Sequence, residues 1–190
     1  MKPLSEQQGF TIIEILVALS IFVVAVLLVG SMYIFGQRSY AKGSDEAELA
    51  QNARVTLDRM SRELRQAADI VTVLPATDTD PLNPPANEIF FQDGHDSNAI
   101  TYYRYYLSGN DLMRQHKEYY FSSEPTVYVA WNSVDQAGNP PIESIIEDNV
   151  VGEYFDNIQF WGSGGEINID ASLSKGQKKL QLETSIFKRN

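Results

Sequence analysis

The sequence predicts an α+β protein in which a long N-terminal helix packs on a C-terminal antiparallel β-sheet. Three observations support this fold class: an uncharged apolar run near the N-terminus, an amphipathic stripe after it, and later segments rich in aromatic and β-branched residues. The chain has 190 residues, which suits one domain with an appendage. It contains no cysteine, which excludes disulfides, thiolate metal sites and cysteine nucleophiles.

The apolar run covers residues 15–35, which are 21 consecutive residues without a charge. At about 1.5 Å per residue they span roughly 31 Å, the hydrocarbon thickness of a bilayer. A buried helix that is apolar on every side would need a larger protein around it. We therefore expect a single membrane-spanning helix. A cleaved secretory signal is the less favoured alternative, because the run is longer than a usual signal core.

The junction before this run reads GFTIIE from Gly9 to Glu14. Glu14 is an ionisable side chain at the start of an otherwise apolar helix. A charge at the centre of a membrane helix costs about 2.5–3.5 kcal/mol, and less near its end. Either Glu14 lies at headgroup depth, where the helix dipole favours an anion, or it has a functional partner.

The polar leader, Gly9, Phe10, Glu14 and the uncharged helix together resemble the class III signal of type IV prepilins and type II secretion pseudopilins. The resemblance implies that prepilin peptidase cuts between Gly9 and Phe10, and that the new amine of Phe10 is N-methylated. It also implies that Glu14 neutralises the Phe10 ammonium of a neighbouring subunit during assembly. Opposite charges attract strongly in a medium of low dielectric, which agrees with this role.

This family resemblance also implies partners and a location. The partners are prepilin peptidase, other pilins or pseudopilins, an inner-membrane assembly platform and the lipid bilayer. The protein would cross the cytoplasmic membrane once, with its C-terminal domain outside, and would later enter a pilus or pseudopilus. The cations that flank the run, Lys2 before it and Arg38 and Lys42 after it, give no clear orientation bias.

The function that the resemblance implies is that of a minor pilin or pseudopilin, in an initiation or tip complex. Two alternatives stay open: a major pilin, and a membrane-tethered extracytoplasmic enzyme or glycan-binding module. Many major pilins carry a proline in the middle of the helix, and residues 25–35 contain none.

We expect four parts along the chain: a leader at 1–9, a transmembrane and assembly helix at 10–36, an amphipathic helix at 37–74 and a β-sheet domain at 75–190. The amphipathic helix is predicted by apolar residues at steps of three and four. These residues are Leu49, Ala53, Leu57, Met60, Leu64, Ala67 and Val71. Pro75 is expected to end the helix, and Gly43 to mark a bend or break.

The predicted strands are short segments separated by turn residues. They cover residues 88–92, 99–107, 111–120, 126–131, 154–161 and a last alternating strand at 180–186. Ser108 to Asp111 predicts a hairpin turn, and three prolines predict a loop at 77–87. The hairpin and the last strands weakly resemble the J-type pseudopilin class.

Catalytic and metal sites are not indicated, so we expect no enzyme, no cofactor and no metal. His95 lies in a polar turn, and His116 lies among cations, where we expect a solvated side chain. The aspartates at 78–80 and 93–96 do not follow a calcium-loop pattern. A net charge of −10 makes direct nucleic-acid binding unexpected.

The strand region is rich in tyrosine. Such residues either pack the sheet or line a sugar-binding face, and we favour packing. The tyrosines in question are Tyr102, Tyr103, Tyr105, Tyr106, Tyr119 and Tyr120.

Overall fold

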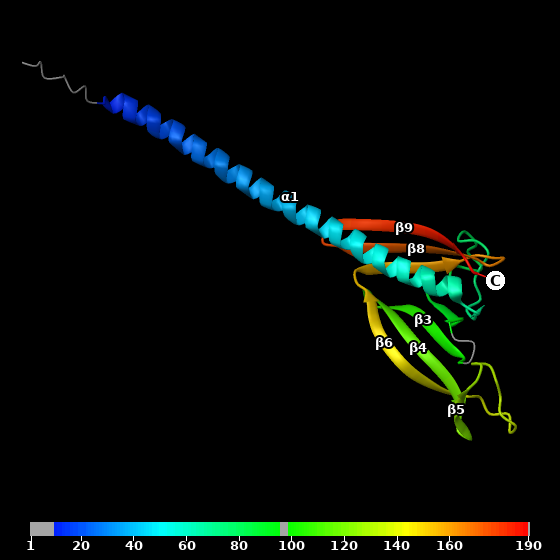
Figure 1. The fold of residues 1–190 in the computed structure, drawn as a ribbon. Helices are drawn as coiled ribbons and strands as arrows, with labels where there is room; N and C mark the ends of the chain where they lie inside the picture. Colours follow the sequence, from blue (N-terminus) through cyan, green and yellow to red (C-terminus); the bar gives the residue numbers. More distant parts are fainter. Residues whose placement is uncertain (1–9, 96–98, 190) are drawn as a thin grey trace, which may run out of the picture. The chain divides into compact units, whose positions relative to one another are not determined.

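The computed structural model describes residues 10–95 and 99–189. The chain divides into two compact units between Ser44 and Asp45, and each unit is described by itself. We call them the N-terminal unit and the globular unit. Helix α1, Ile12–Gln66, supplies the described helical part of both (Figure 1). Its hydrogen bonding continues through Gly43, where a break was a possibility from the sequence.

In the N-terminal unit, the side chains from Phe10 to Ser44 are all exposed. The helix there is long and apolar enough to cross a membrane. The two serine hydroxyls of the apolar run at 15–35 bond within the helix: Ser20 donates to the carbonyl of Leu16 at 2.8 Å, and Ser31 donates to that of Leu27 at 2.8 Å. Hydroxyls satisfied in this way are compatible with a lipid environment.

In the globular unit, α1 buries the predicted apolar stripe. The buried side chains are Leu49, Ala53, Thr56, Leu57, Met60 and Leu64. The predicted helix end at residue 74 is wrong, because α1 ends at Gln66. The chain beyond that point joins the sheet instead: the amide of Ala68 donates to Gln92 and that of Val71 donates to Phe90, both at 2.9 Å.

The globular unit contains two antiparallel sheets (Figure 1). The first comprises β1 (Asp69–Ile70), β2 (Ile89–Gln92), β3 (Thr101–Ser108), β4 (Asp111–Phe121), β5 (Glu124–Tyr128) and β6 (Ile142–Gly152). Its order is β1-β2-β3-β4-β5, and β6 also pairs with β4. The second sheet is β7 (Phe155–Trp161), β8 (Glu166–Lys175) and β9 (Lys178–Phe187), in that order.

The α+β class is confirmed, and the strands divide between two sheets where one was expected. The predicted hairpin joins β3 to β4, with Gly109 at φ 64° and Ser108 paired with Asp111. Strands β6 and β8 were not predicted. In β8 the buried residues alternate regularly, as Ile167, Ile169, Ala171 and Leu173.

A single hydrophobic core joins the α1 stripe to both sheets. From the first sheet it takes Ile89, Phe91, Tyr105 and Leu112, and from the second it takes Phe155, Ile158, Phe160, Ile167, Ile169, Ala171, Leu173 and Ile186. Figure 1 shows β8 and β9 running beside the part of α1 that belongs to this unit. The chain has no cysteine and therefore no disulfide. The globular unit is held together by packing, since residues of α1 and of both sheets share one core.

Gly152 allows the close passage between α1 and the turn from β6 to β7. A Cβ atom at this position would lie 2.8 Å from Oγ1 of Thr56 and 2.5 Å from the ring of Phe155. Thr56 is buried, and its hydroxyl donates to the carbonyl of Val151 at 2.8 Å. This hydrogen bond ties the middle of the globular part of α1 to the end of β6.

Candidate functional site

The first turn of α1 is closed by a reciprocal pair of contacts between Thr11 and Glu14. The backbone amide of Thr11 donates to Oε2 of Glu14 at 2.9 Å, and its hydroxyl donates to the same oxygen at 3.0 Å. The amide of Glu14 in turn donates to Oγ1 of Thr11 at 3.3 Å. This is a capping box, in which two side chains satisfy backbone amides at a helix start. It fixes where the Glu14 carboxylate lies.

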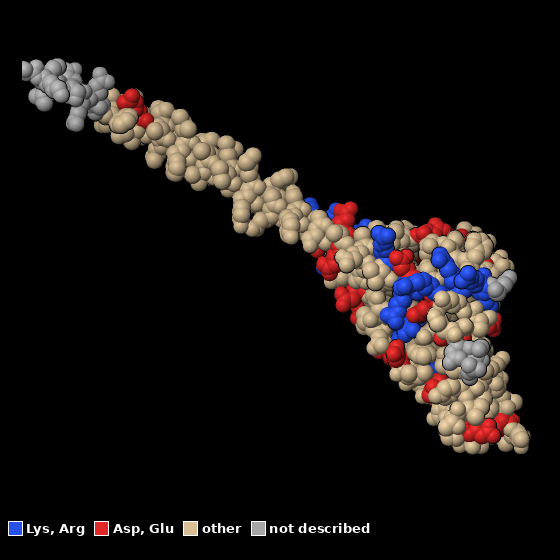
Figure 2. All heavy atoms as spheres, in the orientation of Figure 1, with Lys and Arg blue, Asp and Glu red and all other residues tan. Residues whose placement is uncertain are grey.

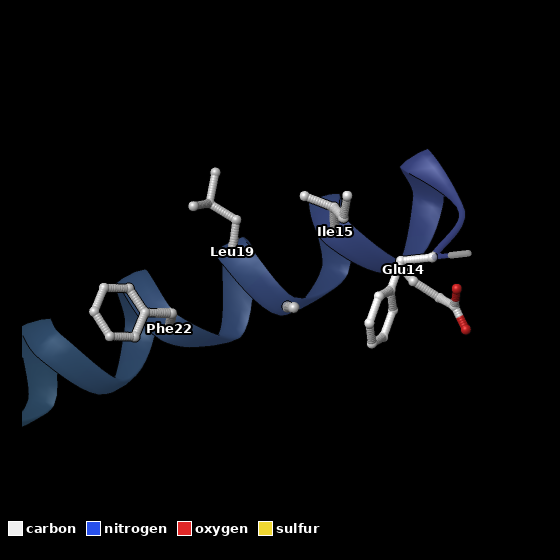
Figure 3. Close-up of a pocket in the computed structure, with 6 residues that line it drawn as sticks. Glu14, Ile15, Leu19 and Phe22 are labelled. Carbon is white, nitrogen blue, oxygen red and sulfur yellow. The ribbon is translucent and has the colours of Figure 1, made fainter. Parts of the chain in front are cut away.

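Glu14 is exposed, and among the described residues it forms no ion pair with a cation. It lies at the rim of a shallow hollow of about 480 Å³ on the side of the helix. The hollow is lined by Phe10, Glu14, Ile15, Ala18, Leu19 and Phe22. Figure 3 shows Ile15 and Leu19 projecting on the same side, while the carboxylate of Glu14 points away from the helix. The arrangement is an apolar surface with one acid at its end.

Of the three site residues predicted from the sequence, the structure describes Phe10 and Glu14 but not Gly9. Gly9 and the leader at 1–9 lie outside the described residues. Phe10 is 85% exposed, directly before the capped turn. Phe10 and Glu14 line the same hollow, so the structure brings the predicted methylation residue and the predicted assembly residue together on one surface.

The capping box is a feature that the sequence reasoning missed. The pattern Thr-x-x-Glu directly before an apolar run is readable in residues 11–14. It gives Glu14 a local structural role besides any role in assembly. The two roles make different demands: glutamine also serves in a capping box, whereas only a carboxylate neutralises a cation.

A second polar cluster, in the globular unit, was also missed. Glu63 of α1 accepts a hydrogen bond from Nε of Arg114 at 3.1 Å and from the hydroxyl of Tyr105 at 2.6 Å. Arg114 also pairs with Glu147 at 3.2 Å, and its guanidinium lies 4.0 Å from the ring centre of Tyr103. Burial, together with the Glu63 carboxylate, raises the pKa of Tyr105 well above its usual value. This cluster fastens α1 to the first sheet.

The expectation of a solvated His116 is wrong. The ring stacks on Tyr103 with centres 4.6 Å apart, and Nε2 is buried without a hydrogen-bond partner among the described residues. Burial, and then the nearby Arg114 guanidinium, lower the pKa of His116. The neighbouring strand β3 places Tyr103 opposite His116, and this pairing covers the ring.

The tyrosine-rich strands mostly pack the globular unit, as favoured from the sequence. Tyr102, Tyr105 and Tyr119 are buried. Tyr102 and Tyr119 meet edge to face with ring centres 5.4 Å apart. Their rings are therefore not available as a platform for a sugar.

In residues 10–95 and 99–189, no three histidine, aspartate or glutamate side chains gather in a way that could hold a metal ion. Of the aspartates considered from the sequence, Asp96 lies outside the described residues. Asp80 makes ordinary turn contacts, because its Oδ1 accepts from the amide of Leu82 at 2.9 Å.

The N-terminal site lies within a segment that matches a known protein family. Residues 4–30 match the family model described as the prokaryotic N-terminal methylation motif. The match includes Gly9, Phe10, the capping box and most of the apolar helix of the N-terminal unit. No curated protein and no solved structure matches the chain. The N-terminal segment therefore carries this motif, and the globular unit has no counterpart in these comparisons.

Proposed function

We propose that this chain, which its methylation motif makes a membrane-anchored type IV pilin-like protein, is a minor pilin or pseudopilin. In this proposal prepilin peptidase cuts between Gly9 and Phe10, and the amine of Phe10 is methylated. The helix of the N-terminal unit spans the cytoplasmic membrane once, with the globular unit outside. An inner-membrane assembly platform then moves the subunit into a filament.

The observation that carries the proposal is the state of Glu14. It lies at the tip of a helix segment whose side chains are all exposed and mostly apolar, and among the described residues only Thr11 donates hydrogen bonds to its carboxylate. An uncompensated charge next to lipid is unfavourable, whereas a nearby ammonium group stabilises it. The Phe10 ammonium of a neighbouring subunit supplies that cation in the proposal.

The apolar hollow beside Glu14 supports the same step. A neighbouring subunit that begins with Phe10 presents an aromatic ring and a cation within one residue. The hollow offers apolar contacts from Ile15, Leu19 and Phe22 next to a carboxylate. The N-terminal Phe10 of a neighbouring subunit would therefore place its ring against the apolar side chains and its ammonium group beside the Glu14 carboxylate.

We place the protein among structural subunits and not among enzymes. Its proposed work is assembly and contact in a type IV pilus or a type II secretion pseudopilus, in an initiation or tip complex. Copy number in purified filaments tests the minor role. A few copies per filament agree with it, and a copy number equal to that of the main subunit would identify a major pilin.

Processing is tested by the mass and the first residue of the mature protein, made in a host with prepilin peptidase. We expect a chain that begins at a monomethylated Phe10. Gly9→Val should leave the leader attached and raise the mass accordingly. A native protein that keeps its first nine residues, or that lacks the apolar helix, would contradict the proposal.

The role of Glu14 is tested by separating its charge from its capping contacts. Glu14→Gln keeps a capping side chain but removes the charge, and we expect normal cleavage with loss of incorporation into filaments. Thr11→Val removes the two hydroxyl contacts of the cap but keeps the charge, and we expect incorporation to persist. If Glu14→Gln assembles normally while Thr11→Val does not, Glu14 acts through the cap alone and the charge-pairing step is wrong.

A further inference from the structure

The globular unit has an unusual concentration of exposed apolar side chains around β5 and β6. Of the twelve large hydrophobic residues exposed in the described part of this unit, eight fall between residues 127 and 150. They are Val127, Tyr128, Trp131, Val134, Ile142, Ile145, Ile146 and Val150. Scattered exposed apolar residues are ordinary, but a concentration of them in one hairpin region and its edge strand is typical of an interaction surface.

Strand β6 presents a free edge beside this group. It pairs with β4 along one side, and no strand of the described residues pairs with its other side. Eight of its eleven residues are exposed. A long edge strand offers a row of unpaired amide and carbonyl groups, to which a further strand adds readily.

Natural proteins protect such edges with lysine, proline or charged side chains, and β6 lacks most of this protection. Residues 142–152 contain no lysine and no proline. Two of the acids in β6 are held by β4, because Glu143 pairs with Lys117 at 3.0 Å and Glu147 pairs with Arg114 at 3.2 Å. By contrast β9, which pairs only with β8 in the described part of the chain, begins with two lysines.

The charge of the region indicates what kind of strand fits. Residues 124–152 contain five acids and no lysine or arginine. Figure 2 shows red and tan but no blue over the end of the sheet where β5 lies. A second copy of β6 would set acid against acid, and an anionic lipid surface would be repelled. An occupant with basic residues is attracted.

We propose that the free edge of β6 docks an extended segment of a partner protein, one that alternates apolar side chains and is flanked by lysine or arginine. Backbone hydrogen bonds to β6 would lengthen the first sheet by one strand. The exposed isoleucines and valines would contact the apolar side chains of the segment. Its cations would be attracted by Glu124, Asp135 and Asp148, the three acids of this region that form no ion pair among the described residues. The inference is independent of the filament role proposed above.

The absence of cysteine allows a direct test on the full-length chain in detergent micelles. Ile146→Cys introduces a single thiol into β6, at a position with no Cα partner in β4, so the β4–β6 pairing is little disturbed. The probe is a synthetic peptide of alternating valine and threonine between pairs of lysines, with one central cysteine. Under mild oxidation we expect a disulfide-linked adduct between this peptide and the Ile146→Cys variant. The matched control is Val73→Cys, because Val73 is 89% exposed elsewhere in the globular unit, and it should not form the adduct.

Three further measurements separate the proposal from its alternatives. A peptide with glutamate in place of lysine, and a peptide N-methylated on alternate amides, should both fail to cross-link. Ile146→Lys should weaken binding of a cysteine-free labelled peptide by about tenfold, with Val73→Lys unchanged and both variants keeping the wild-type urea midpoint. Equal binding of the N-methylated peptide, or equal adducts at positions 73 and 146, would overturn the proposal. A disulfide-linked dimer of the Ile146→Cys variant that excludes the peptide would also overturn it, and would identify a second copy as the occupant.

Discussion

The two parts of helix α1 differ sharply in how they meet their surroundings. Up to Ser44 every described side chain is exposed, and most are apolar. From Leu49 onward the apolar stripe is buried against the two sheets. Each part also carries one notable acid. Glu63 accepts hydrogen bonds from Arg114 and Tyr105, whereas the Glu14 carboxylate accepts them only from Thr11 among the described residues.

This difference shows which part of the helix finds partners for its apolar side chains and its acid within the same chain. The second part satisfies its apolar stripe and its acid with residues of its own fold. The first part leaves its apolar surface and its acid without such partners among the described residues. In the function proposed above, lipid and a neighbouring subunit would supply them. Substitutions made in pairs, one in each part, test this contrast.

The largest expected effect comes from truncating a buried leucine. Leu64→Ala should lower the free energy of unfolding of the globular unit by about 3 kcal/mol, because Leu64 is fully buried and leaves a cavity. Leu28→Ala, at a side chain that is 61% exposed, should leave this free energy unchanged. Urea unfolding in micelles, followed by tryptophan fluorescence, measures both. Equal losses of unfolding free energy for Leu64→Ala and Leu28→Ala would show that the two parts of α1 do not differ in how much their apolar side chains stabilise the globular unit.

The two glutamates give the next effect. Glu63→Ala should destabilise the globular unit by about 2 kcal/mol, since it removes a partner of the buried Arg114 guanidinium. Glu14→Ala should leave that stability unchanged and impair assembly. The same urea series and filament counts provide the readouts. A Glu63→Ala variant with wild-type stability would mean that Glu147 alone suffices to compensate Arg114.

A smaller effect is expected from Thr56 and Thr11, two threonines whose hydroxyls donate hydrogen bonds. Thr56→Val should lower the free energy of unfolding by about 1 kcal/mol, because it leaves the carbonyl of the half-buried Val151 without its donor. Thr11→Val, in the N-terminal unit, should not change the unfolding of the globular unit. The midpoint of thermal unfolding of each variant is compared with that of the wild type. A lower midpoint for Thr11→Val alone would contradict the expectation.

The smallest expected effect depends on pH. The pKa of His116 is lowered from its usual value of 6.5 by burial and by Arg114, so the unfolded chain binds more protons than the folded chain just below that pH. Stability should therefore fall as the pH drops through 6.5 toward the folded pKa. His116→Gln should flatten this part of the profile. His95→Gln, at a side chain that is 65% exposed, is the control and should leave the slope intact.

Local patterns predicted much of this molecule. The stripe of α1, the β3–β4 hairpin at Gly109 and the apolar run all depend on spacing within a few residues. Strand β8 and the capping box of Thr11 and Glu14 follow equally local patterns and were readable in the same way.

Other features depend on contacts between distant residues. Glu63 and Arg114 are 51 positions apart, and neither neighbourhood indicates that they meet. The helix ends early because the amide of Ala68 bonds to Gln92 of β2, a tertiary contact that outweighs local propensity. Strand β6 shows no alternation, since it lies at an edge and shifts register twice against β4.

The capping box at the start of α1 has a consequence for maturation. Thr11 and Glu14 close the first turn with their own side chains, and Phe10 is the only residue between that turn and the proposed cut. The capping contacts of this turn therefore come from residues that stay in the chain after the proposed cut. Cleavage would create an amine on Phe10 and so change the charge at the chain end. The capped first turn that follows Phe10 would not have to refold.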